Sequence, residues 1–420
     1  MEYLVLAGLL ALLVGVHWYL WRRLVADTTS TRRVRRAGAA VLLLLGVLMV
    51  ATTALEAAHL LFPVQQIIAW PGYLWSALLL YLTLLLIVRD AAAKLIAVLR
   101  RLTARDSVDT PAPQSTVPTQ GRRSGSLLVQ RTATDTTSVR APAAPAASRR
   151  VFLARTTALV ATVAATTTVG AGTYEVFRGP RLKHLTVPIA KLPRQAHGYR
   201  IAVVSDIHLG PILGHDFAQQ VVKTVNSAQA DLIAIVGDLV DGRVDDLRGA
   251  VAPLAQLTAR DGVFFVTGNH EYESGAPPWI EHVRALGLQP LENARRELPY
   301  FDLAGVNDVS GQDYGQGPDY DRALGDRDRS RPSVLLAHQP VMVDEAMRFG
   351  VDLQLSGHTH GGQLWPGNYL AGLAGPAAAG LKQVGDTQLY VTRGAGAWGP
   401  PVRVGAPSDI TVVTLAGRHP

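Results

Sequence analysis

The sequence predicts an α/β (α+β) domain that is preceded by an all-α transmembrane region. Three observations support this prediction. Long apolar runs separated by arginine clusters fill the first ninety residues. From about Thr186, short β-rich runs alternate with amphipathic helical stretches, and Gly and Pro lie at the joints. Five of the β-rich runs end in Asp, Asn or His, residue types that bind metal ions.

The composition restricts the possible functions. The chain has 420 residues, a net charge of +7 and a charged share of only 17%. A basic protein can bind nucleic acid, but here the arginines lie beside apolar segments, where membrane topology accounts for them. We therefore expect no nucleic-acid partner. The chain has no cysteine, which excludes disulfides and thiolate metal sites.

Three apolar runs are each long enough to cross a hydrocarbon core of about 30 Å as a helix. They are Tyr3–Leu20, Ala37–Phe62 and Trp70–Val88, and they place a membrane region with three helices at residues 1–102. A buried helix of a soluble protein is the alternative, but three such runs in ninety residues disfavour it. Glu56 lies near the end of the second run, so we expect its side chain to reach the membrane interface.

Arginines predict how the spans are oriented. The loop between the first two spans carries six of them, and the segment between the second and third spans carries none. The positive-inside rule then places the first loop in the cytoplasm and the N-terminus outside. Residues 103–147, rich in Ser, Thr, Pro, Ala and Gly, are typical of a disordered cytoplasmic linker.

A second membrane-directed segment covers residues 148–178. It begins Ser148-Arg-Arg-Val-Phe-Leu153, continues with an Ala/Thr/Val-rich core, and resembles a twin-arginine export signal. The alternative is an ordinary fourth transmembrane helix. Both interpretations carry the chain outward, so we expect a multi-pass membrane protein with an extracytoplasmic C-terminal domain. The resemblance to an export signal also makes the twin-arginine translocation machinery a candidate partner. Without a clear cleavage site, the segment is expected to remain as an anchor.

Polar side chains follow five apolar strands of the C-terminal part. They are Asp206 and His208, Asp238, Asn269 and His270, His338, and His358 and His360. Loops at the carboxyl ends of strands are where α/β folds collect their ligand sites. Carboxylate, amide and imidazole groups in this arrangement predict a metal site.

The motif set Asp206-x-His208, Gly237-Asp238, Gly268-Asn-His-Glu271, His338-x-Pro340 and Gly357-His-Thr-His360 resembles the calcineurin-like metallophosphoesterase family. The resemblance extends from about Arg200 to Leu415. It implies a four-layer αββα sandwich over residues 186–420, and hydrolysis of a phosphoester by water activated between two metal ions.

The same resemblance implies a role for each motif residue. Asp206, His208 and His360 would hold the first ion, Asn269, His338 and His358 the second, and Asp238 would bridge the two. His270 would protonate the leaving oxygen or bind the phosphate, and Glu271 would orient His270. Imidazole and oxygen ligands fit two divalent ions of Mn, Fe or Zn.

Two further stretches refine this interpretation. Asp241-Gly-Arg243 is interpreted as a turn, with Asp241 outside the site. Protein serine/threonine phosphatases of the superfamily carry Asp-Arg-Gly at this place, so the departure disfavours a phosphoprotein substrate. Trp365 and Trp398 flank the metal motifs and either contact an apolar part of the substrate or pack in the core.

The expected function is extracytoplasmic hydrolysis of phosphomonoesters or phosphodiesters, on lipid or cell-envelope substrates. One alternative is a lipid-linked pyrophosphohydrolase, although that chemistry belongs on the cytoplasmic side. Another is a non-catalytic sensor that binds metal or phosphate, which the intact ligand set and His270 disfavour. A transporter is disfavoured because the spans contain few polar groups.

Overall fold

The computed structural model describes residues 2–58, 60–106 and 149–417. The chain forms two compact units, Met1–Gly38 with Leu82–Thr162 and Ala39–Tyr81 with Val163–Pro420. The predicted linker at 103–147 falls outside the described residues apart from its first four, which end a helix.

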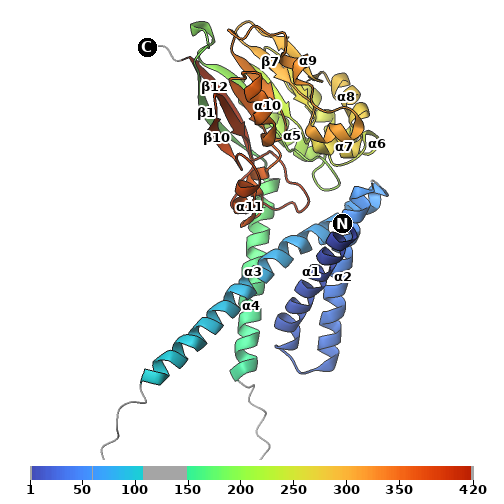
Figure 1. Cartoon of the computed structure of the whole chain (residues 1–420). Helices are drawn as coiled ribbons and strands as arrows, with labels where there is room; N and C mark the ends of the chain where they lie inside the picture. Colours follow the sequence, from blue (N-terminus) through green and yellow to red (C-terminus); the bar gives the residue numbers. More distant parts are fainter. Residues whose placement is uncertain (1, 59, 107–148, 418–420) are drawn as a thin grey trace, which may run out of the picture. The chain divides into compact units, whose positions relative to one another are not determined.

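Four long helices make up the N-terminal part of the chain (Figure 1). They are α1 (Glu2–Leu20), which a π-helical turn extends to Ala26, α2 (Arg32–Ala57), α3 (Phe62–Asp106) and α4 (Arg149–Phe177). Among the described residues, three helical segments are long and apolar enough to cross a membrane: Leu4–Ala26, Arg32–Ala57 and Arg149–Phe177. Two of them lie in the predicted membrane region, and the third coincides with the twin-arginine-like segment.

The third predicted span, Trp70–Val88, lies inside α3, which is not one of these three segments of the described chain. Helix α3 does not end at Arg89 but continues to Asp106. It also buries several apolar and aromatic side chains inside the protein: Ala69, Tyr73, Trp75, Ala77 and Tyr81. Part of the apolar surface of α3 is therefore packed inside the protein and is not available to face lipid.

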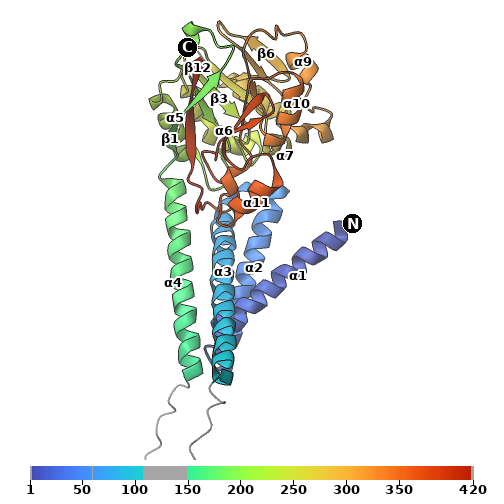
Figure 2. The same ribbon diagram turned by 60° about the vertical axis from the view of Figure 1, so that its left-hand side comes forward.

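Two six-stranded sheets form the C-terminal sandwich (Figure 2). The first runs β1 (Arg181–Ile189), β12 (Asp409–Gly417), β2 (Tyr199–Val204), β3 (Leu232–Val236), β4 (Val263–Val266) and β5 (Gln289–Pro290). The second runs β10 (Gly380–Val384), β11 (Thr387–Val391), β9 (Leu353–Ser356), β8 (Ser333–Leu336), β7 (Asp302–Gly305) and β6 (Ala294–Glu297). Strand β1 begins at Arg181, five residues before the predicted start of the domain.

Alternation along the strands produces the layers. In β2, Ile201 and Val203 join the core between the two sheets, whereas Ala202 and Val204 face the helices that cover the first sheet. Those helices are α5 (His215–Ser227), α6 (Val244–Val251) and α8 (Ala276–Ala285). Helices α9 (Tyr320–Leu324) and α10 (Val343–Arg348) cover the second sheet. The four-layer αββα sandwich is confirmed, and burial on both faces explains why its central strands are apolar throughout.

Strand direction brings the motifs together. Strands β2, β3 and β4 run parallel to one another in the first sheet, and β7, β8 and β9 do so in the second. Parallel neighbours end at the same edge of a sheet, so the loops after β2, β3, β4, β8 and β9 meet at one end of the sandwich.

Candidate metal centre

The residues after the strand ends share an uncommon backbone conformation. Asp206, His208, Asp238, His358 and His360 all have positive φ, between 50° and 72°. This left-handed conformation is uncommon for residues other than glycine, although Asp and His tolerate it better than most. Strain of this kind, of the order of 1–3 kcal/mol per residue, persists where the surrounding structure enforces it and is concentrated at functional sites.

Backbone hydrogen bonds between neighbouring loops enforce this conformation. The N–H of Asp206 donates to the carbonyl of Gly237 at 3.0 Å, and the N–H of His208 donates to the carbonyl of Asp238 at 3.2 Å. The loops after β2 and β3 therefore hold each other, and their acidic and imidazole side chains are directed into the same space.

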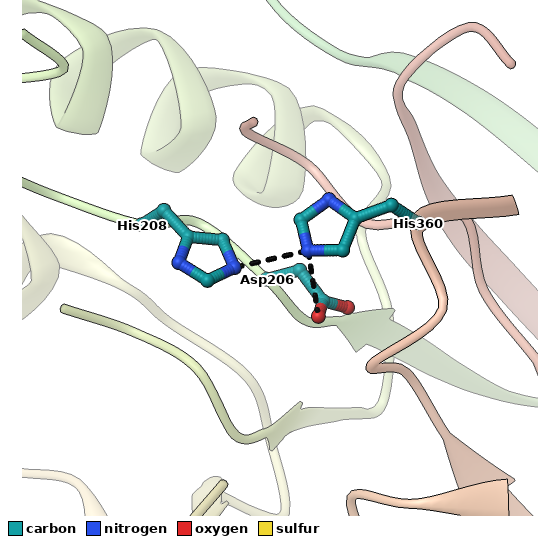
Figure 3. Close-up of side chains that lie close together, drawn as sticks. All are labelled: Asp206, His208 and His360. Atoms are coloured by element: carbon teal, nitrogen blue, oxygen red, sulfur yellow. Dashed lines mark hydrogen bonds and ion pairs between the residues drawn. The ribbon is translucent and has the colours of Figure 1, made fainter. Parts of the chain in front are cut away.

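The first cluster consists of Asp206, His208 and His360, all buried (Figure 3). The Nε2 atoms of His208 and His360 face each other at 3.0 Å, and His360 Nε2 lies 3.4 Å from Asp206 Oδ1. The Asp206 carboxylate is held in place because both of its oxygens accept from the backbone N–H of His358, at 2.9 and 3.2 Å. Three possible metal-ligand atoms, from loops about 152 residues apart in the sequence, thus lie close together.

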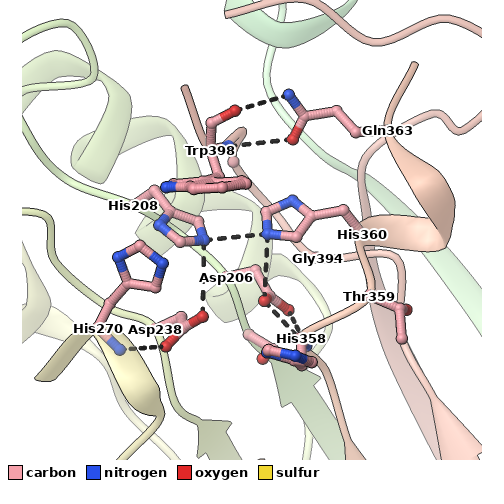
Figure 4. A network of polar contacts seen from close by, with 12 residues as sticks. Asp206, His208, Asp238, His270, His358, Thr359, His360, Gln363, Gly394 and Trp398 are labelled. Carbon is pink, nitrogen blue, oxygen red and sulfur yellow. Dashed lines mark hydrogen bonds and ion pairs between the residues drawn. The ribbon is translucent and has the colours of Figure 1, made fainter. Parts of the chain in front are cut away.

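The second cluster consists of Asp238, His338 and His358, with Asn269 beside it. His338 Nε2 lies 3.0 Å from Asp238 Oδ2, and His358 Nδ1 lies 3.0 Å from Asn269 Oδ1. Asp238 Oδ2 is also 3.9 Å from His208 Nε2. Asp238 therefore lies between the two clusters, and Figure 4 shows it among the imidazoles.

The donor set fits divalent cations. Two carboxylates that are at most 2% exposed, Asp206 and Asp238, face imidazole nitrogens with no lysine or arginine between them among the contacts described. The Nδ1 atom of His338 is bound to the Val236 carbonyl at 2.7 Å, while its buried Nε2 makes no well-directed hydrogen bond despite its closeness to Asp238. An imidazole oriented through one nitrogen, with the other left for a ligand, is the arrangement that metal sites use.

Neighbouring charges set the pKa values of the cluster. Burial raises the pKa of Asp206. Burial also opposes ionisation of Asp238, but attraction to His338, His270 and His208 outweighs it and holds the pKa of Asp238 well below its usual range. For His360, burial and the nearby His208 lower the pKa well below that of free imidazole. A neutral His360 beside an ionised Asp238 is the protonation state in which both groups can bind a cation.

Asp241 is the residue that the sequence interpretation placed outside the site. Its Oδ1 lies 2.8 Å from His208 Nδ1 and 2.9 Å from His270 Nδ1, and the residue is only 8% exposed. Burial lowers the pKa of His270, but attraction to Asp241 reverses this shift and raises the pKa to about 10. The backbone N–H of His270 also donates to Asp238 Oδ1 at 3.0 Å. The available sequence signal was the spacing Asp238-x-x-Asp241, which returns a second carboxylate to the same loop.

Glu271 binds backbone N–H groups of the neighbouring loops and does not orient the imidazole of His270. Its carboxylate accepts from the N–H groups of Asp238, Leu239 and Gly268, at 3.0, 2.7 and 2.6 Å. The side chain is fully buried, and burial together with the charge of Asp238 raises its pKa to about 7. Glu271 therefore ties the loop after β3 to the loop after β4, and the imidazole of His270 is oriented by Asp241.

Arg403 was not identified from the sequence. It is buried, and its guanidinium donates to the carbonyl oxygens of Gly396 at 2.6 Å and Arg393 at 2.8 Å, and it lies 3.3 Å from His360 Nδ1. Arg403 thus braces the loop that leads to Trp398 and lies behind His360. Trp398 is 55% exposed, and its ring meets that of His270 edge to face at 5.8 Å.

Two glycines allow the loops to approach this closely. A methyl group at Gly357 would meet Ser205 Oγ and Asp206 Oδ2, and one at Gly396 would meet the carbonyl of Ile207. The motif Gly357-His-Thr-His360 therefore needs its glycine so that the loop after β9 can pass beside the Asp206 carboxylate.

Comparison with known proteins agrees with this geometry. Residues 199–362 match the model of the calcineurin-like phosphoesterase family. A transmembrane protein with metallophosphoesterase domain from Danio rerio is 38% identical over 250 residues, which are 56% of this chain and 57% of the relative. An uncharacterized metallophosphoesterase from Helicobacter pylori is 39% identical over 59% of this chain and 67% of its own length.

A third relative is matched along nearly its whole length. It is an uncharacterized metallophosphoesterase from Bacillus subtilis, 31% identical over 65% of this chain and 99% of the relative. The chain spans little more than half the length of the Danio rerio relative. The sandwich, the two Asp/His clusters and these matches lead to one conclusion: the chain belongs to the calcineurin-like phosphoesterase family.

Proposed function

We propose that the chain is a membrane-anchored, extracytoplasmic metallophosphoesterase that cleaves phosphomonoester or phosphodiester bonds with water activated between two metal ions. The observation that supports this most directly is the pair of buried Asp/His clusters on either side of Asp238. A carboxylate placed between two sets of imidazole nitrogens is what a dinuclear centre requires.

In this proposal Asp206, His208 and His360 hold one ion, and Asn269, His338 and His358 hold the other, with Asp238 shared. Mn, Fe or Zn fits this mixture of imidazole and oxygen ligands. The bound ions would supply an acidified water and neutralise the charge of the phosphate. Asp241 would hold the Nδ1 atoms of His208 and His270. This contact would orient both rings so that their Nε2 atoms point toward the centre.

His270 would serve as the proton donor. The contact of its Nδ1 with Asp241 favours the charged imidazole, which leaves a proton on Nε2 for the leaving oxygen. Glu271 would keep Asp238 in position by holding the backbone N–H of that residue. These roles use only groups that line one end of the sandwich.

Three features support a place at the membrane. Apolar helices α1, α2 and α4 are long enough to span it, arginines cluster between the first two, and the relative from Danio rerio is named a transmembrane protein. We propose that Arg149 and Arg150 are recognised by the twin-arginine translocation machinery, and that lipid or cell-envelope phosphoesters are the substrates.

The test uses the full chain, solubilised, stripped of metal and resupplied with Mn or Zn. Metal should restore hydrolysis of bis-p-nitrophenyl phosphate, p-nitrophenyl phosphate or both, and Asp238→Asn should lower it at least about a hundredfold, because the shared ligand is weakened. Asp216→Asn, whose side chain is 97% exposed on α5, is the matched control and should leave the rate unchanged.

Two outcomes would count against the hydrolase. Turnover that survives in Asp238→Asn would show that the clusters do not carry the reaction. A folded, metal-loaded protein that hydrolyses neither ester would favour the sensor interpretation. The ratio of the two rates in the wild-type protein separates diester from monoester chemistry.

A further inference from the structure

A cavity of about 690 Å³ opens beside the metal centre, inside the compact unit formed by Ala39–Tyr81 with Val163–Pro420. One wall consists of the motif loops and includes Asp241, His270 and Trp398. The opposite wall comes from helices α2 and α3. This volume lies within the range of about 300–1,000 Å³ that small-molecule sites occupy.

The wall from α2 changes in character along the helix. Met49, Thr53 and Glu56 lie four and three residues apart, the spacing that places side chains on one helical face, and Val50 borders the same stripe. The stripe is apolar at Met49 and Val50, which belong to a helix long and apolar enough to span a membrane, and acidic at Glu56. The cavity thus extends from apolar residues of α2 to the imidazole of His270.

Aromatic contacts fix the wall from α3. Trp70 stacks on Phe177 with ring centroids 5.4 Å apart, and Phe62 packs against the core cluster of the first sheet. Tyr73, which lines the cavity, is only 7% exposed. The start of α3 is therefore packed onto the sandwich and encloses the cavity.

The charges decide which part of a substrate belongs in the cavity. Glu273 lines it, and the carboxylate of this residue opposes the entry of a phosphate anion. The phosphate therefore belongs at the metal clusters, next to His270, and the Met49 and Val50 end is left for an uncharged apolar group.

Exposed apolar side chains near the metal motifs also support an apolar partner. Trp398 is 55% exposed and is tied through its backbone to the side chain of Gln363, at 3.0 and 2.9 Å (Figure 4). Helix α11 (Gly367–Ala374) begins four residues after Gln363, and its Tyr369 and Leu370 are 64% and 68% exposed. Aromatic and apolar residues of this kind are enriched where proteins meet a membrane interface.

We propose that the substrate is an amphiphile, and that the cavity between α2 and the metal centre holds its hydrocarbon chain while the phosphate lies at the metal clusters. This inference rests on the proposed function, because it assigns the phosphate to the dinuclear centre. It adds the class of molecule, a phosphoester with at least one alkyl chain, and the wall that recognises the chain.

Alkylphosphonates test the chain site without turnover, because their C–P bond resists phosphoester hydrolysis. The full chain, loaded with Mn and held in amphipol without free detergent, is titrated calorimetrically with methyl-, butyl-, hexyl- and octylphosphonate. Affinity should rise along the series, by up to about fourfold for each methylene that leaves water for the cavity. Octylphosphonate should bind at least about tenfold more tightly than methylphosphonate.

Two tryptophan substitutions on α2 locate the effect. Thr53→Trp fills the cavity and should abolish the gain with chain length while methylphosphonate affinity persists. Leu44→Trp, nine residues earlier on the opposite face of α2 and 58% exposed, should keep the full gain. Val50→Trp replaces Thr53→Trp if the latter lowers the thermal unfolding temperature.

The proposal is overturned if methyl- and octylphosphonate bind equally, or if the filled cavity retains the gain. Either result is separate from a failure of the hydrolase, which the p-nitrophenyl assays measure on the same preparation. A preference for long chains without metal-dependent turnover would support the amphiphile site and remove the proposed reaction.

Discussion

Asp241 connects the imidazoles of His208 and His270. One of its oxygens contacts His208 in the first cluster, and the same oxygen contacts His270, which lines the cavity. The contact with this buried carboxylate favours the charged form of His270. The residue thereby links the orientation of a candidate ligand to the protonation of the candidate acid.

Removing this carboxylate should be visible in the metal-free protein. There the pKa of His270 is raised to about 10, with attraction to Asp241 outweighing burial. Asp241→Asn should lower the pKa of His270, since burial then acts without its main opponent, while Asp238 and Glu273 still favour the charged imidazole. Histidine NMR titration of the metal-free wild type and variant measures the change. A His270 pKa that does not move would show that other groups hold the proton.

The same contact has a defined pH window in stability. Because the folded-state pKa of His270 exceeds that of the unfolded chain, its contribution is complete below about pH 6.5 and is lost as the pH rises toward 10. Burial opposes ionisation of Asp241, but His208 and His270 lower its pKa below its usual range, so its contribution is lost in acid. The free energy of unfolding of the metal-free wild type should exceed that of Asp241→Asn by about 2 kcal/mol near pH 6 and by less at pH 10. Denaturant unfolding at both pH values checks this.

At the scale of elements, the centre depends on loops that pass within van der Waals contact. The loop after β9 lies against the loop after β2, and Gly357 is the residue at the contact. Its backbone N–H donates to the carbonyl of His338 at 2.9 Å, so the loop after β8 is joined to the same arrangement. Displacement of one loop would therefore move ligands of both clusters.

Gly357→Ala should damage the centre without unfolding the sandwich. The added methyl group would meet Ser205 and Asp206, so the Asp206 carboxylate must shift, and overpacking of this kind costs about 1–3 kcal/mol. We expect metal-dependent turnover to fall at least about tenfold and bound metal, measured by mass spectrometry, to decrease.

Gly249→Ala provides the matched control for this change. Gly249 lies on α6, and a methyl group there meets nothing within 4 Å. The substitution should leave turnover and metal content unchanged and slightly stabilise the helix. Equal effects of the two substitutions would show that the contact at Gly357 has no special importance.

At the scale of the whole molecule, the proposed topology makes opposite predictions for two positions. Alkaline phosphatase fused after Pro420 should be active, because it folds outside the cytoplasm, and the same fusion after Asp106 should be inactive. The physical basis is the cluster of arginines between α1 and α2, which favours the inner face. The reverse result at either position would invert the assignment.

The sequence by itself determined the class of the fold and the family. Buried strands such as β3 are apolar at every position because helices cover one face and the partner sheet covers the other. A carboxylate, amide or imidazole directly after such a strand therefore marks a strand end, and five of these in order identify the motif set. The long apolar helices were visible for a similar reason, since length and composition alone define a candidate span.

The tertiary structure decided which groups face one another. Asp241 and His208 are 33 residues apart, and His208 and His360 are 152 apart, so no local pattern records that their side chains meet. Glu271 can accept from three backbone N–H groups because the loops after β3 and β4 lie next to each other. The wall that α2 adds beside His270 likewise exists only through packing. Periodicity reports the direction in which one element faces, and contacts between distant elements arise only when the sheets and helices are assembled.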